Sequence, residues 1–290
     1  MSRNDARQRG IALVTVLLVL SLALLLVGGM LRGQVTSSRS TAMQVQHKQL
    51  WQAALGAEHM AVARLEQALR TLNEADWRAP QRDLAFADAR VDLHIEDLAG
   101  RFNIGSIVDL QHPPKIQIER WQRLLKTLQL PATLLVPQAN ESEPSTPVAR
   151  GRVVVPMAAD IGLLRLREGI NAQVLRTLEP WVVWLPAQVG LNVNTASPTV
   201  LATLGLEQTV VDRLAAQPLK GIGELGRLAG QGNEPFNVQG LTTTSQWYRV
   251  HLVVRLGPRV LHSRSDLFVD PKTQKISVVR RAIKPAAEVE

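Results

Sequence analysis

Apolar residues in the first quarter of the chain form two patterns, one continuous and one periodic. From Ile11 to Leu31, 21 consecutive residues include no charged side chain. At about 1.5 Å per residue, a helix of that length spans about 30 Å, the thickness of a bilayer's hydrocarbon core. Further on, apolar residues recur every three or four positions, at Leu50, Ala54, Ala57, Ala61, Leu65, Leu69 and Leu72. We therefore expect one continuous helix over 11–72, with 11–31 in a membrane and 32–72 beyond it.

The rest of the chain combines strand and helix patterns. Residues 89–97 alternate apolar and polar side chains, as in a half-buried strand, and so do three stretches near the C-terminus, at 245–257, 259–270 and 274–283. Between them, apolar periodicity predicts helices at 115–130, 158–168, 171–184 and 207–216, and a loop rich in Pro and Ser at 137–151. The sequence thus predicts an α+β fold in which strands precede and follow a helical region.

Composition narrows the chemistry available to the chain. The 290 residues include no cysteine, which excludes disulfides, thiol catalysis and thiolate metal ligands. The six histidines lack the spacing of metal ligands, and no Gly-x-Ser-x-Gly nucleophile motif occurs. We therefore expect a protein that is not an enzyme and needs no cofactor. The net charge of +8 is scattered, so contact with nucleic acid or anionic lipid is permitted but not required.

A short basic leader precedes the apolar run and has two interpretations. Arg3, Arg7 and Arg9 favour a cytoplasmic N-terminus, because basic flanks of membrane segments stay inside. The run is longer than a secretory signal and lacks a clean Ala-x-Ala site, so hydropathy alone favours a plain signal anchor. However, Gly10 followed by "IALVTVLLVL" resembles the leader of a type IV prepilin. That resemblance implies cleavage by a prepilin peptidase between Gly10 and Ile11, with N-methylation of Ile11.

Two motifs in the second half favour a competing hypothesis, in which the chain is a membrane-anchored periplasmic protein for DNA binding or uptake. "NVNTASPTVLATL" (192–204), followed by "GIGELG" (221–226), resembles a helix-hairpin-helix module, whose glycine-rich hairpin cradles a phosphate backbone. Lys220 and Arg227 are isolated there and lie close to Glu224, which favours a structural role instead. In that structural interpretation, Asn194 or Thr195 caps a helix that begins near Pro198, and the glycine-rich stretch is a loop between helices.

The order of the parts resembles the minor pseudopilin GspK family of type II secretion systems. Its most specific points are "GRFN", with Arg101, Phe102 and Asn103, and "NVNTA", with Asn192, Asn194 and Thr195. Thr15 stands at mature position five, where most pilin-like proteins have glutamate, and the missing carboxylate is a trait of this family. The resemblance implies a type IV pilin-like fold, with a long N-terminal helix on an antiparallel sheet and a large α-helical insertion. Its expected parts are the leader 1–10, the membrane segment 11–31, its periplasmic continuation 32–72, the first part of the head 73–105, the insertion 106–245 and the closing strands 246–290.

The same resemblance implies a location and partners. We expect a single-pass protein of the inner membrane whose head lies in the periplasm, at the tip of a short pseudopilus. Its expected partners are I-type and J-type minor pseudopilins in a heterotrimeric tip complex, the major pseudopilin, the inner-membrane secretion platform and the prepilin peptidase. Nucleic acid is disfavoured as a partner.

Calcium is the one cofactor that the resemblance raises. Relatives carry acidic stretches in the insertion that are associated with calcium, a cation that needs six to eight oxygen ligands. The corresponding region here, "VPQANESEPSTPVARGRVVVPM" (136–157), offers only Glu141 and Glu143. We therefore expect no metal site in this region.

Overall fold

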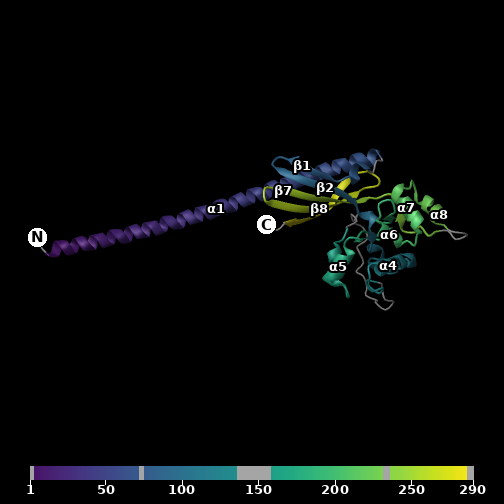
Figure 1. Cartoon of the computed structure of the whole chain (residues 1–290), viewed down its shortest axis with the longest axis horizontal. Coiled ribbons are helices and arrows are strands. Elements are labelled where there is room, and N and C mark those ends of the chain that lie inside the picture. The colour runs from purple at the N-terminus through teal and green to yellow at the C-terminus, as the bar shows by residue number, and fades with distance from the viewer. Residues whose placement is uncertain (1–2, 72–74, 136–157, 231–235, 286–290) are drawn as a thin grey trace, which may run out of the picture.

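One long helix determines the shape of the molecule, as Figure 1 shows. The computed structural model describes residues 3–71, 75–135, 158–230 and 236–285. Helix α1 (Arg3–Thr71) has 69 residues, so the predicted helix is confirmed up to residue 71, and it also includes most of the leader. The part before Leu50 projects away from the head, whereas the part from Leu50 onward lies on a sheet.

The head contains a five-stranded antiparallel sheet. Its strands are β1 (Gln81–Phe86), β2 (Ala89–Asp97), β7 (Trp247–Leu256), β8 (Arg259–Val269) and β9 (Ile276–Pro285), in the spatial order β1-β2-β7-β8-β9. The strand predicted at 89–97 and the three predicted near the C-terminus are therefore confirmed. Strands β2 and β7 are distant in sequence but pair over eight residues, from Arg90 opposite Arg255 to Asp97 opposite Tyr248. This pairing brings together the two ends of the chain segment that lies between β2 and β7.

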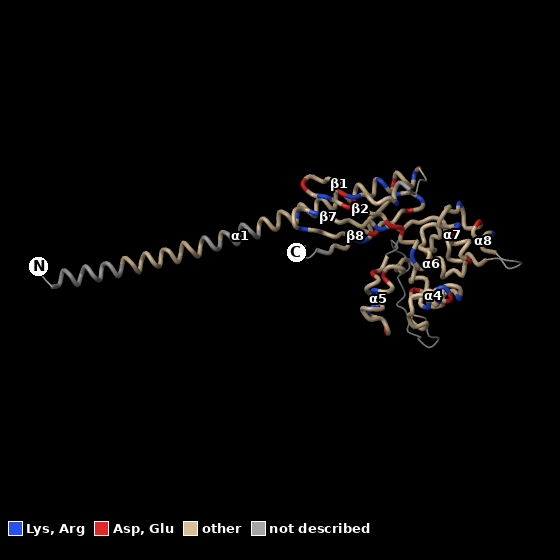
Figure 2. The backbone as a smooth tube through the Cα atoms, in the orientation of Figure 1, with Lys and Arg blue, Asp and Glu red and all other residues tan. Residues whose placement is uncertain are grey.

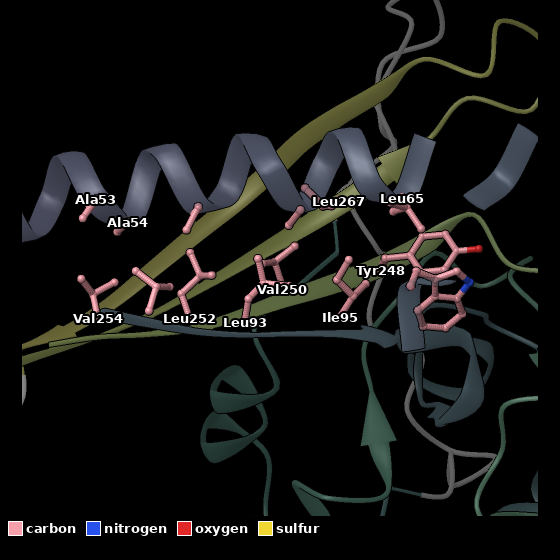
Figure 3. Packing of buried hydrophobic residues seen from close by; sticks show 14 of the residues in the cluster. Ala53, Ala54, Leu65, Leu93, Ile95, Tyr248, Val250, Leu252, Val254 and Leu267 are labelled. Carbon is pink, nitrogen blue, oxygen red and sulfur yellow. The ribbon is translucent and has the colours of Figure 1, made fainter. Parts of the chain in front are cut away.

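Small side chains let α1 approach the sheet closely. Ala57 and Ala61 are fully buried, and apolar side chains of β2 and β7 point toward this face of the helix (Figure 3). Alternate residues of β7, from Tyr248 to Val254, are buried, which is the period of two that a one-sided sheet requires. The stripe of alanines predicted from the sequence is thus the contact surface between helix and sheet.

One charged residue lies within this interface. Glu58 of α1 is 2% exposed, and Arg281 of β9 donates to its carboxylate from Nη2 at 2.7 Å and from Nε at 2.9 Å. The Ser265 hydroxyl of β8 also donates to it. Burial opposes ionisation, but the hydrogen bonds from Arg281 and Ser265 and the charge of Arg281 lower the pKa of Glu58. The carboxylate therefore joins α1 to the far edge of the sheet.

Short elements make up the chain between β2 and β7. They are α3 (Gly105–Val108), α4 (Lys115–Thr127), α5 (Ala172–Leu178), α6 (Pro198–Ala202), α7 (Gln208–Ala216) and α8 (Ile222–Ala229), with the 3₁₀ turns η1 (Leu98–Gly100) and η2 (Ile161–Leu166). Two pairs of parallel two-residue strands connect them: β3 (Phe102–Asn103) with β4 (Val182–Val183), and β5 (Leu191–Asn192) with β6 (Leu241–Thr242). These elements bury apolar clusters separate from the core beneath α1, one around Trp121 and one around Val200. A further short helix, α2 (Ala75–Arg78), follows α1.

Five local features of the fold differ from the predictions. The helices predicted at 158–168 and 171–184 shrink to η2 and α5, because Gly169 turns the chain at φ +79° and Pro180 ends α5. Val182 and Val183 instead form β4, a choice that their pairing with Phe102 and Asn103 determines. Strand β1 was not predicted, since it is an irregular edge strand with a register shift near Asp83, whose φ is +54°.

The other two errors concern α6 and α8. "GIGELG" opens helix α8 rather than forming a loop, with Gly221 as its N-cap residue. Helix α6 is capped by Ser197, whose hydroxyl accepts the Val200 N–H, and neither Asn194 nor Thr195 caps it. Pro198 does occupy the first turn of α6 as expected. This stretch includes several polar residues that could cap a helix. Asn194 and Thr195 instead form hydrogen bonds with residues elsewhere in the fold.

Candidate functional site

The N-terminal part of α1 exposes apolar side chains along its length. Gly10, Ile11 and Thr15 lie on this helix. The structure describes these three residues only by their place on the helix. Of the described residues that follow, the large apolar ones from Val16 to Met30 are each more than half exposed. Among the residues described with their side chains, no helix combines the length and hydropathy of a membrane-crossing segment.

The "GRFN" motif lies at the first turn from the sheet into the insertion. Asn103 is buried, and its amide nitrogen donates to the carbonyls of Pro186 at 2.9 Å and Val189 at 3.1 Å. Its oxygen accepts the N–H groups of Gly105 and Leu185, both at 3.0 Å. All four bonding positions of the amide are therefore used, and only an asparagine side chain supplies two donors and two acceptors at this length.

The neighbouring Phe102 adds an apolar contact to the same turn. Its ring lies 5.3 Å from that of Trp121 on α4, and its backbone N–H donates to the Trp181 carbonyl at 2.9 Å. The turn after β2 is thereby attached both to the core of the insertion and to the segment that leads into β4.

Asn192 and Thr195 of "NVNTA" converge on Asp97, the last residue of β2. The Asn192 amide donates to Asp97 Oδ2 at 2.8 Å, and the Thr195 hydroxyl donates to the same oxygen at 2.7 Å. The Ala99 N–H donates to Oδ1 at 2.8 Å. Burial raises the pKa of Asp97, against the lowering effect of these donors. Residues almost a hundred positions apart thus share one buried carboxyl group.

Asn194 binds the hairpin that follows. Its amide nitrogen donates to the carbonyls of Leu219 at 3.0 Å and Thr243 at 3.1 Å, and its oxygen accepts the Leu219 N–H at 2.8 Å. Arg78 of α2 donates to the Asn194 carbonyl at 3.0 Å. This asparagine therefore holds the loop between α7 and α8 against the chain that returns to the sheet.

Arg101 connects the outer face of the sheet to α5. Its Nε lies 2.5 Å from Glu96 Oε1, and its Nη1 donates to the Glu179 carbonyl at 2.7 Å. His251 of β7 bonds the other Glu96 oxygen at 2.9 Å. Although burial opposes ionisation, the hydrogen bond from His251 and the charge of Arg101 hold the pKa of Glu96 at about 2.

The structure thus places all six motif residues at one junction between sheet and insertion. Sequence reasoning missed Asp97, Glu96 and Glu179, which complete this junction. Asp97 could have been found, since the strand alternation places it on the buried face, where a carboxyl group needs hydrogen-bond partners. A groove of about 370 Å³ lies beside the junction and is lined by Trp77, His94, Arg101, Pro180, Thr195 and Ser197 among others.

Among the described residues, the structure shows no assembled site for a metal ion or a phosphate group. Among the described residues, no three His, Asp or Glu side chains gather as metal ligands, and Glu141 and Glu143 lie outside that part of the chain. In the hairpin between α7 and α8, the Lys220 N–H at the start of the glycine-rich stretch donates to Glu224 at 3.3 Å. This backbone N–H is therefore already bonded to a carboxylate of the same stretch. Figure 2 shows basic and acidic residues interleaved over the head and insertion, without a basic stripe.

Comparison with known proteins gives a consistent result. No family model matches the chain. Type II secretion system protein K of Pseudomonas aeruginosa is 29% identical over 289 residues, covering 87% of this chain and 86% of that protein. The Klebsiella pneumoniae protein of the same name is 29% identical (68% and 69% covered), and that of Pectobacterium carotovorum is 27% identical (95% and 96% covered).

The fold has a solved counterpart. A chain in the crystal structure of the GspK–GspI–GspJ complex from enterotoxigenic Escherichia coli matches with a TM-score of 0.66 at 18% identity, covering 86% of this chain and 100% of that chain. The match confirms the predicted α+β, pilin-like fold. The relatives confirm the overall resemblance to the GspK proteins. The chain is therefore similar over most of its length to type II secretion system protein K of several bacteria, and it shares the fold of a chain in the GspK–GspI–GspJ complex.

Proposed function

We propose that this chain occupies the tip of the type II secretion pseudopilus, where it initiates assembly and caps the fibre with I-type and J-type minor pseudopilins. This assembly serves the export of proteins across the outer membrane. The observation that carries the proposal is the fold shared over 86% of the chain with a protein that was solved in complex with GspI and GspJ.

A membrane anchor is the first part of the proposal. The uncharged run 11–31 follows a basic leader, and the described apolar side chains from Val16 to Met30 make no contact with the head that would bury them. Such a surface is unfavourable in water and favourable in lipid. We therefore place the leader in the cytoplasm, 11–31 in the inner membrane and the head in the periplasm.

The tip position rests on Thr15 and on the insertion. A carboxylate within the apolar helix of a pilin needs a partner, such as the N-terminal amine of a neighbouring subunit, because an unpaired charge in lipid is costly. Thr15 needs no such neighbour. The insertion adds bulk to the head, to which Asn103 and Asn194 attach it through bonds to backbone carbonyls and Asn192 through a bond to the Asp97 carboxyl group. A subunit of this kind suits the end of a fibre better than its body.

Processing at the N-terminus provides the first test. After co-expression with a prepilin peptidase, we expect the intact mass to show loss of residues 1–10 and one added methyl group on Ile11. Gly10→Val should block processing, because a branched side chain would occupy the cleavage position. Gly28→Val is the matched control: a Cβ at Gly28 meets no atom within 4 Å, so this variant should be processed normally.

Co-purification with I-type and J-type minor pseudopilins tests the tip complex separately. We expect a stable complex with both partners present. An unprocessed Met1, or cleavage on the far side of the membrane, would contradict the pseudopilin assignment and favour the DNA-binding hypothesis. Salt-dependent retention of duplex DNA by the full chain would then be the decisive assay.

A further inference from the structure

Three of the described histidines lie on the outer face of the sheet, which is the face turned away from α1. Burial alternates along β2 and β7, and it places His94 and His251 on this face. The two residues stand directly opposite each other, and their rings are stacked with centroids 6.0 Å apart and planes inclined by 29°. His262 of β8 lies on the same face, opposite Val253. The register thus brings His94 and His251 together as a pair and places His262 opposite an apolar residue.

One carboxylate connects this pair to the insertion. His251 Nε2 lies 2.9 Å from Glu96 Oε2, and the other oxygen of Glu96 accepts from Arg101 Nε at 2.5 Å. Nη1 of the same arginine donates to the carbonyl of Glu179, the C-cap residue of α5, at 2.7 Å. A change of charge at the two histidines therefore acts directly on a contact that attaches α5 to the sheet.

The other charged groups around the pair already have partners. Across the sheet and at α5 they form ion pairs with one another: Asp92 with Arg255, Asp266 with Arg249 and Arg280, and Glu179 with Arg264. In the groove beside His94, Arg78 donates to the Asn194 carbonyl, and Asp97 accepts from Asn192 and Thr195. Among the described residues of the outer face, each carboxylate therefore has an arginine partner, and none remains to balance a second charged imidazole.

We propose that His94 and His251 form an acid-responsive pair, which takes up one proton readily and resists a second. The first proton resides on His251, where the Glu96 carboxylate balances its charge. A second proton, on His94, places two cations on directly opposite residues of neighbouring strands, where like charges repel each other. The second charge also competes with Arg101 for the same carboxylate, and it thereby weakens the contact between α5 and the sheet.

The direction of the resulting pH dependence follows from His94. Burial and the charge of His251 lower the pKa of His94 below its ordinary value of 6.5, against the raising effect of Glu96. The unfolded chain therefore binds more protons than the folded chain once the pH falls below about 6.5, and the free energy of unfolding decreases. This window lies above that of Glu58 and Glu96, whose ordinary pKa is 4.5. The inference does not depend on the location of the protein in a pseudopilus.

An NMR titration of the full chain in detergent, with ¹³C-labelled histidine rings, tests the coupling between the two residues. Between about pH 8 and pH 5, we expect the midpoint of His94 to lie below 6.5. His251→Gln should raise this midpoint, because the charge opposite His94 is then absent. His262→Gln is the matched control, since His262 lies on the same face but opposite Val253, and it should leave the midpoint of His94 unchanged.

Urea unfolding at about pH 7.5 and pH 5.5 tests the effect on stability. His94 is exposed, so His94→Gln should fold, and it should lose less unfolding free energy between the two pH values than the unaltered chain. His262→Gln should respond as the unaltered chain does. Two results would overturn the proposal. One is an unchanged midpoint of His94 in His251→Gln, and the other is a pH-dependent loss in His94→Gln equal to that of the unaltered chain.

Discussion

Buried polar residues attach the insertion to the sheet through individual hydrogen bonds. Asn103 and Asn194 bind backbone groups, and Asn192 binds the carboxyl of Asp97. Each amide serves as both donor and acceptor, so replacing it by an apolar residue would strand several buried groups at once. The hydrogen bonds of the motif residues thus explain why these residue types stand at these positions.

The ion pair between Glu58 and Arg281 gives a prediction about asymmetry. Arg281→Met leaves the Glu58 carboxylate buried without its cation, which we expect to cost about 3–5 kcal/mol of unfolding free energy. Glu58→Gln leaves Arg281, whose side chain is 42% exposed, free to reach water. Its expected cost is about 1–3 kcal/mol. Urea unfolding of both variants measures the difference, and equal costs would contradict the argument.

The same carboxylate predicts a pH dependence. The pKa of Glu58 is lower in the folded chain than its ordinary value of 4.5, and Glu96 behaves alike, with a pKa of about 2. The unfolded chain therefore binds more protons as the solution becomes acidic, so the stabilisation is complete above about pH 4.5 and is lost as the pH falls further. In urea titrations at about pH 5 and pH 3, Glu58→Gln should lose less stability than the unaltered chain.

At the scale of elements, the contact between α1 and the sheet depends on small side chains. Ala57 and Ala61 are fully buried, so the helix axis lies close to β2 and β7. Larger residues at these positions would push the two layers apart. The periodic stripe predicted from the sequence therefore determines which face of α1 is buried. Its small side chains also determine how closely α1 approaches the sheet.

Ala61→Leu tests this packing. The added methyl groups have no space, and we expect a loss of about 1–3 kcal/mol in unfolding free energy. Ala63→Leu is the matched control, because Ala63 is exposed on the same helix and the change there should stay within about 0.5 kcal/mol. Similar losses in both variants would show that helix propensity rather than packing determines the effect.

For the whole molecule, the proposed tip position depends on two features at opposite ends. In that proposal, the leader and apolar run direct processing and membrane insertion, and the helical insertion between β2 and β7 adds to the surface of the head. The junction around Asp97 joins the insertion to the head, with Asn192 and Thr195 as its donors. These hydrogen bonds therefore connect the insertion to the sheet of the head.

Thr15→Glu tests the role of the missing carboxylate. A new carboxylate in the apolar helix would require a partner above it, so we expect fewer pseudopili and reduced secretion in cells that carry this variant. Thr15→Ser keeps a hydroxyl and should behave as the unaltered chain does. Pseudopilus number and secreted protein are both measurable, and normal values for Thr15→Glu would argue against the charge explanation.

Features that depend on local pattern could be predicted from the amino-acid sequence. The long helix, the strand at 89–97 and the closing strands follow from periodicity, because side-chain direction repeats with backbone geometry. The resemblance to the GspK family was also noted from local features, namely Gly10, Thr15 and two short motifs. None of these requires knowledge of distant contacts.

Features that depend on contacts between distant residues became visible only in the folded chain. Val182 and Val183 form a strand because Phe102 and Asn103 lie beside them, although their local pattern predicts a helix. Thr195 binds Asp97 instead of capping α6. Burial and partner geometry, which set the energy of a polar group, arise only when the chain has folded, and so the junction around Asp97 could not be predicted from the sequence.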